Sequence, residues 1–111
     1  MKELAPEIGM SDATFESCQM SNGVLTIFLT SWDNCIIKIV FTEVIHFEYK
    51  IDSIVSCAYE MPDNDVFLKE AISMYYEKIP NRTLFKLFVI RDIDDVDFMK
   101  VVAEKAIVTK E

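Results

Sequence analysis

The stretch that decides the fold class of this chain is Asn22-Gly23-Val24-Leu25-Thr26-Ile27-Phe28-Leu29-Thr30. Asn-Gly is a turn dipeptide, because both residues tolerate the positive φ that a tight hairpin turn requires. The seven residues after it are strand formers, with Leu25, Ile27 and Leu29 on one face. Residues 13–20, in front of the turn, form a second strand candidate. We therefore expect a β-hairpin here.

Strand patterns continue along the chain. The run from Cys35 to Phe41 is apolar on both faces except for Lys38, as in a buried central strand. From Ile45 to Asp52 apolar and polar residues alternate, which predicts a strand with one dry and one wet face. The same alternation continues to Glu60, and residues 83–90 are again β-like. An antiparallel sheet accounts for these patterns.

One helix interrupts the strands. The segment Pro62-Asp63-Asn64-Asp65 offers capping side chains and negative charge, both of which favour a helix start. Apolar residues then recur at helical spacing from Phe67 to Tyr75, and Pro80 ends the pattern. We expect the main helix at about residues 64–79.

The last segment, residues 98–108, fits both a helix and a strand. A strand is preferred, because the strand at 83–90 needs a partner and the short acidic run Asp92–Asp97 can join the two as a hairpin. The predicted fold class is α+β: a largely antiparallel sheet of six or seven strands, curled around or packed on the one main helix. All 111 residues form a single globular domain, with residues 1–10 loosely ordered.

Charge is distributed unevenly along the chain, whose net charge is −8. Residues 1–65 hold eleven acidic and three basic side chains, whereas residues 66–111 hold eight of each. Nucleic acid and anionic membrane surfaces require basic patches, so we expect neither as a partner. An acidic surface instead favours a cationic protein.

The cysteines and the apolar runs indicate a cytoplasmic protein. Cys18, Cys35 and Cys57 form an odd, widely spaced set, which is typical of reduced core thiols and not of a disulfide framework. No apolar run is long enough to cross a membrane. The first ten residues lack the basic start and apolar stretch of a signal peptide.

The spacing of the acidic residues, cysteines and glycines does not match any of the metal-binding or phosphate-binding motifs considered. The acidic run Asp92–Asp97 has Asp97 where a calcium loop requires glycine, and Ala103 where it requires glutamate. One histidine and three dispersed cysteines lack the close ligand pairs of zinc sites. Gly9 and Gly23 are the only glycines, so no glycine-rich phosphate loop exists. We expect no metal and no cofactor.

Catalysis has two candidate residues. His46, the only histidine, sits beside Glu48 on the predicted wet face and could act as a general base. Cys57 is the nearest nucleophile candidate. If one strand continued through both, their side chains would point to opposite faces, which disfavours a catalytic pair.

Trp32 lies in a predicted turn, Trp32-Asp33-Asn34, between two apolar strands. An exposed tryptophan there would be a natural binding anchor. We expect instead that it folds back over one end of the core, and keep it as a candidate anchor.

A family resemblance rests on four groups of residues: Asp12-Ala13, Asn22-Gly23-Val24-Leu25-Thr26, Trp32 and Phe41-x-x-Val44. This pattern is similar to small acidic bacterial immunity proteins of contact-dependent and other polymorphic toxin systems, over the first fifty residues. The resemblance implies a cytosolic, non-enzymatic inhibitor that covers or distorts the active site of a toxin.

The functional hypothesis is therefore an inhibitor that neutralises a cationic toxin, such as a nuclease, with carboxylates in place of phosphates. It requires those carboxylates to gather into one anionic patch. The candidate contact residues are Trp32, Asp33, Glu43, Glu48, Asp52, Asp63 and Asp65.

Three other functions stay open. A self-associating accessory or structural domain, for example a homodimer, would explain the high apolar content. A small enzyme would use His46 or Cys57. A barrel that binds a small molecule is the third.

Overall fold

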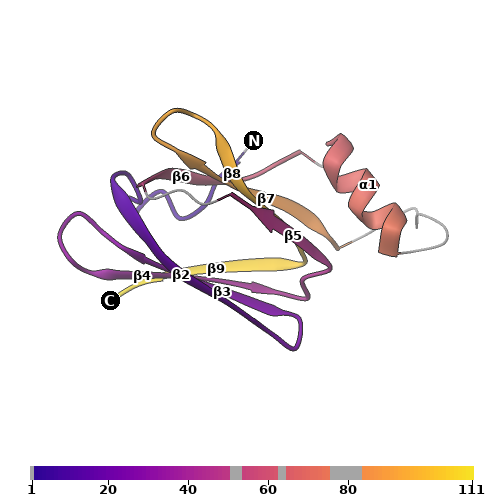
Figure 1. Cartoon of the computed structure of the whole chain (residues 1–111), viewed down its shortest axis with the longest axis horizontal. Helices are drawn as coiled ribbons and strands as arrows, with labels where there is room; N and C mark the ends of the chain where they lie inside the picture. Colours follow the sequence, from indigo (N-terminus) through magenta and orange to yellow (C-terminus); the bar gives the residue numbers. More distant parts are fainter. Residues whose placement is uncertain (1, 51–53, 63–64, 76–83) are drawn as a thin grey trace.

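In the computed structural model the described residues are 2–50, 54–62, 65–75 and 84–111 (Figure 1). They form nine strands and one helix: β1 (Lys2–Glu3), β2 (Ala13–Ser21), β3 (Val24–Thr30), β4 (Ile36–Thr42), β5 (His46–Tyr49), β6 (Ile54–Glu60), α1 (Val66–Tyr75), β7 (Lys86–Asp92), β8 (Asp97–Ala103) and β9 (Lys105–Lys110).

The strands form one antiparallel sheet in the order β5-β8-β7-β6-β2-β3-β4-β9, with β1 paired to β6. The two end strands of this order are β5 and β9. Along the chain β4 leads directly into β5, and β8 leads directly into β9. Thr42 pairs with Lys105 and His46 with Val102, so one ladder runs through both junctions. The sheet therefore closes on itself.

A bulge at Glu43 lies at the junction of β4 and β5, where residues 43–45 oppose only residues 103–104. Glu43 adopts a positive φ of 54°, the left-handed conformation of a bulged residue. On either side of it the ladder continues, because the Glu104 N–H donates to the Thr42 carbonyl and the Ile45 N–H donates to the Val102 carbonyl. The bulge bends the long strand from one layer of the sheet to the other.

The main core lies between two layers of this closed sheet, with β2, β3, β4 and β9 in one layer and β6, β7 and β8 in the other (Figure 1). Its largest fully buried side chains alternate along each strand, as the strand period of two requires. They include Leu25, Ile27 and Leu29 of β3, Ile37, Ile39 and Phe41 of β4, and Ile90 and Met99 of β7 and β8.

Helix α1 covers the outer surface of the second layer. Its Leu68, Ala71 and Ile72 pack against a second buried cluster that includes Leu87 and Val89 of β7. Asp65 caps the helix, because its Oδ1 accepts the Phe67 N–H at 2.9 Å. At ten residues α1 is short, and no helix among the described residues is long and apolar enough to cross a membrane.

The expected sheet curled around or packed on one main helix is wrong. The sheet makes up most of the described chain, its core lies between its own layers, and the short helix lies outside them. Residues 83–90 read as apolar on both faces for this reason: Phe88 and Ile90 face the inner core, while Leu87 and Val89 face α1. The expected helix residues 64 and 76–79 lie outside the described residues.

The expected count of six or seven strands is also too low. It missed β1, and it treated residues 98–108 as one element where the chain bends at Glu104 to give β8 and β9. The preference for strand over helix in this segment is confirmed. The hairpin at Asn22-Gly23 is confirmed as well, with φ of 52° and 77° at the turn and Ser21 paired to Val24.

Candidate functional site

Three turns gather at one end of the closed sheet, on the left of Figure 1. The register links them strand by strand: Thr30 pairs with Thr14 and Ile36, Ala13 pairs with Val55, and Val55 pairs with Asp92. Neighbouring antiparallel strands start and stop at a shared edge. Residues 5–12, 31–36, 93–96 and 110–111 therefore form one surface, which we call the loop end.

The loop end is acidic. Its acidic residues are Glu7, Asp12, Asp33, Asp94, Asp95 and Glu111, and its one basic residue is Lys110. Lys110 is already engaged, because its Nζ lies 3.2 Å from Asp33 Oδ2. The other five carboxylates have no salt-bridge partner among the described residues.

The turn that carries Trp32 is held by polar contacts. The Ser31 hydroxyl donates to the Asp33 carboxylate, and the Cys35 N–H donates to Ser31 Oγ at 3.0 Å. Hydrogen bonding from Ser31 and from Lys110 lowers the pKa of Asp33, because both contacts favour the ionised carboxylate. The turn is thus ordered by its own side chains.

Trp32 itself projects into solvent, with 74% of its surface exposed. The expectation that it folds back over the core is wrong, because Ser31 and Asp33 fix the turn in a form that points the indole outward. Tryptophan is one of the side chains enriched among the residues that dominate binding energy at protein interfaces. An ordered turn that exposes one is a candidate protein-binding anchor.

The turn between β7 and β8 is ordered in a similar way. Asp92 Oδ1 accepts the N–H groups of Asp94 and Val96 at 2.8 and 3.0 Å. At the base of the hairpin, Arg91 Nε donates to Asp97 Oδ1 at 2.6 Å. Asp92 and Asp97 therefore hold the turn, which leaves the carboxylates of Asp94 and Asp95 exposed.

Two exposed apolar side chains, Ile93 and Val96, accompany those carboxylates. Apolar groups flanked by charged ones are the usual composition of a protein interface. No three His, Cys, Asp or Glu side chains in the part of the chain that the structure describes are placed to hold a metal ion.

The structure does not bring the predicted contact residues together. Trp32 and Asp33 lie at the loop end, but Glu43 lies at the far end of β4, about 20 Å away by the length of a seven-residue strand. Glu48 pairs with Lys100 across β5 and β8, and Asp65 is the cap of α1. Asp52 and Asp63 lie outside the described residues.

Asp12, Asp94 and Asp95 were not among the predicted contact residues, since the acidic run from Asp92 to Asp97 was interpreted first as a solvated hairpin loop and only second as an acidic docking surface. A signal was available, because successive turns of an antiparallel sheet alternate between its two ends. The turn at Trp32 is one strand after the turn at Asn22, so it lies at the opposite end. Following this alternation through β7 would have placed the acidic turn beside Trp32.

The two catalytic candidates are also apart. β5, which carries His46, and β6, which carries Cys57, are separated by β8 and β7, or about 14 Å at normal strand spacing. His46 Nε2 lies 3.8 Å from Glu48, and its ring lies beside Phe67 of α1. Cys57 instead lies next to Tyr59, whose pKa it raises by a side-chain hydrogen bond. The geometry gives no histidine–cysteine pair.

Comparison with known proteins adds no assignment to these observations. No family model, no curated protein and no solved structure matches the chain. The likeness to immunity proteins remains a hypothesis from the first fifty residues. A function must therefore be argued from the geometry of the loop end.

Proposed function

We propose that this chain is a non-enzymatic inhibitor of the immunity type, which docks its loop end on a cationic toxin domain in the cytosol and occludes the active site. The observation that carries the proposal is the exposure of Trp32 on an ordered turn that shares one surface with Asp94 and Asp95. The three free cysteines suit a reducing compartment.

The chemistry of this surface fits a basic partner. Exposed carboxylates attract basic groups from a distance and thereby raise the association rate. Trp32, Ile93 and Val96 then supply apolar area, which is lost to water only on contact. Because Ser31 and Asp92 already order the two turns, little conformational entropy is lost when they dock.

The experiment is co-expression with the candidate cationic toxin domains encoded next to the gene, with bacterial growth as the readout. The wild-type chain should restore growth against one of them, and Trp32→Ala should weaken its affinity for that toxin by about 2 kcal/mol or more. Met20→Ala is the matched control, because Met20 is also an exposed apolar residue (44%) but lies at the end of β2 that is far from the loop end. Equal affinities of Trp32→Ala and Met20→Ala would sink the proposal.

A second candidate, self-association, has one observation in its favour. Val40 and Ile107 pair on the outward face of β4 and β9, and Ile107 is exposed. A homodimer formed through this face would bury them. Sedimentation of the wild type and of Ile107→Lys at several concentrations tests this candidate: a dimer lost in the variant supports it, and a monomeric wild type excludes it.

A further inference from the structure

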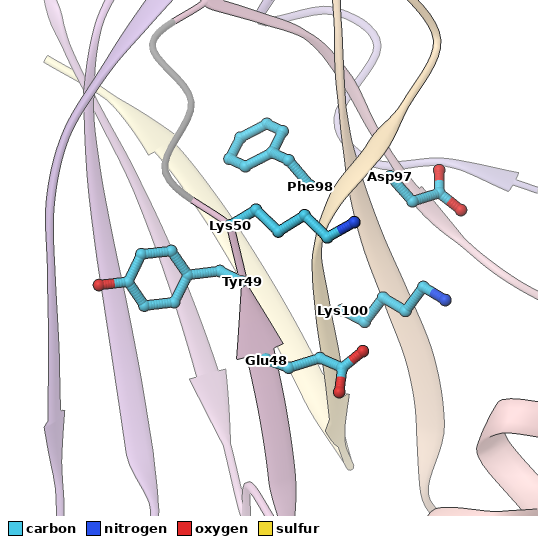
Figure 2. A pocket seen from close by; sticks show the side chains of 6 residues that line it. All are labelled: Glu48, Tyr49, Lys50, Asp97, Phe98 and Lys100. Atoms are coloured by element: carbon cyan, nitrogen blue, oxygen red, sulfur yellow. The ribbon is translucent and has the colours of Figure 1, made fainter.

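The two end strands of the sheet, β5 and β9, differ in what they present to solvent. The end of β5 borders a hollow of about 290 Å³, whose lining side chains are shown in Figure 2. Charged groups of this hollow already contact other side chains. The Lys100 ammonium lies 4.7 Å from the centre of the Phe67 ring, and Glu48 lies 3.8 Å from His46. β9 presents the hydrogen-bonding groups of its backbone instead.

β9 uses one of its two edges for the sheet, and β4 is its only strand partner among the described residues. The Glu111 N–H donates to the Ile36 carbonyl at 2.9 Å. In an antiparallel ladder every second residue bonds to the partner strand, and the residues between them point their N–H and C=O groups the other way. In β9 the groups that point away from β4 are those of Ala106, Val108 and Lys110. A row of this kind is a template for one more strand.

The side chains of β9 are complementary to those of a second copy of the same strand. When two copies run antiparallel with Val108 opposite Val108, Lys105 of each copy comes opposite Glu111 of the other. Ile107 comes opposite Thr109, a pair of strand-forming residues. Lys105 and Glu111 are both exposed, and neither forms an ion pair among the described residues. Opposite charges that face each other across two strands stabilise the pairing.

The backbone selects the same register. The outward-pointing groups of the two strands meet each other, since Ala106 pairs with Lys110 and Val108 with its own copy. A shift by one residue would set these groups against residues that already bond to β4. Lysine on an edge strand normally discourages pairing, but Lys105 faces a carboxylate here. Lys110 alternates to the other face of β9, where its Nζ lies 3.2 Å from Asp33.

We infer that the chain forms a homodimer in which two copies of β9 pair antiparallel about Val108 and join the two sheets edge to edge. The dimer uses the free edge of β9, whereas the outward face of Val40 and Ile107 stays on its surface. It meets the loop end only at residues 110–111. A contact of one strand per copy is small, so the association is weak and depends on protein concentration. The inference does not rest on the proposed inhibitor function, because the partner is a second copy of the chain.

The test is a charge swap, followed by sedimentation at protein concentrations up to about 1 mM, where weak dimers form. Lys105→Glu places two carboxylates opposite each other at both ends of the paired strands, and Glu111→Lys places two ammonium groups there. Each variant alone should self-associate about tenfold more weakly than the wild type. An equimolar mixture of the two variants should regain the wild-type association, because each contact then joins one carboxylate and one ammonium group.

Lys69→Glu and Glu70→Lys are the matched controls, because they make the same changes of charge at exposed residues of α1. Alone or mixed, the control variants should associate as the wild type does. A wild type that stays monomeric, or a mixture of the β9 variants that associates no better than either one alone, would overturn the inference. Equal weakening in the controls would mean that net charge acts, and would overturn it as well.

Amide hydrogen exchange of the wild type distinguishes edge pairing from any other dimer. The amides of Ala106, Val108 and Lys110 should exchange more slowly as the protein concentration rises. Those of Ile107 and Thr109, which bond to β4, should be protected at every concentration. A dimer without this alternation along β9 would have a different interface and would contradict the inference.

Discussion

Lys110 Nζ lies 3.2 Å from Asp33 Oδ2, and this ion pair ties the last strand to the turn that presents Trp32. The two residues are 77 positions apart in the sequence. The contact also removes the one basic charge of the loop end from competition with a partner. This one ion pair therefore both holds the turn that carries Trp32 and engages the one basic side chain of the loop end.

The stability of the chain should depend on pH through Asp33. Its pKa in the folded state is lowered from 3.8, first by Ser31 and then by Lys110. A lowered carboxyl pKa contributes stability above the unfolded value, and that contribution is lost as the pH falls through the folded value. The wild type should therefore melt above Asp33→Asn at neutral pH, and the gap should close below pH 3.8. Thermal melts of both proteins over this range decide the point, and a constant gap contradicts it.

Charge at the hairpin tip should control the rate of partner association. Asp94→Asn combined with Asp95→Asn should slow association with a cationic partner several-fold at low salt, and salt should shrink the difference. Glu43→Gln combined with Glu70→Gln is the control: both residues are exposed, neither belongs to the loop end, and the loss of charge is the same. Stopped-flow association rates at two salt concentrations provide the measurement. Equal slowing in both double variants would show that net charge acts, and not the hairpin tip.

Truncation of two neighbouring isoleucines of β4 should change the stability by very different amounts. Ile37 is fully buried in the inner core, whereas Ile36 is 47% exposed. Ile37→Ala should lower the free energy of unfolding by about 3 kcal/mol, through lost burial and the cavity left behind. Ile36→Ala should change it by about 0.5 kcal/mol or less. Urea unfolding of both variants tests which face of β4 is inside, and similar losses would contradict the closed sheet.

The bulge at Glu43 should favour glycine. A residue with a side chain pays about 1 kcal/mol in the left-handed region, which glycine does not. Glu43→Gly should therefore be about 1 kcal/mol more stable than Glu43→Ala, the variant that keeps the strain and removes the same carboxylate. Chemical denaturation measures the difference. The reverse order would mean that the bulge does not hold this conformation in solution.

The elements that sequence reasoning found are those specified locally. Asn22-Gly23 determines its own turn, and the helical spacing after Asp65 marks where a helix forms. Neither signal says what a helix packs on. The position of the helix depends on β7, because one apolar face of this strand contacts the inner core and the other contacts α1. A strand that is apolar on both faces also fits other packings, so the sequence alone did not place the helix.

The site was harder to predict, because it depends on contacts between distant residues. Exposure of Trp32 depends on how Ser31 and Asp33 bond within the turn, which composition does not reveal. The acidic surface joins Asp12 to Asp94 through the pairing of β2, β6 and β7. The sequence analysis counted charge separately before and after residue 65. This division put Asp12 and Asp94 in different parts, although the sheet places both at the loop end.

The seam between β2 and β6 has a consequence for how the molecule opens. Among the described residues it consists of Ala13 opposite Val55 and Thr14 opposite Ile54, whereas β2 pairs with β3 from Thr14 to Ser21. Thermal fluctuations will part the ring at this short seam before they part any long ladder. Segment 5–12 spans this seam, because it joins β1, which pairs with β6, to β2, which pairs with β3. A protein partner that contacts both β2 and β6 at this seam would hold the ring closed. Amide hydrogen exchange at Ala13 and Val55 would then slow.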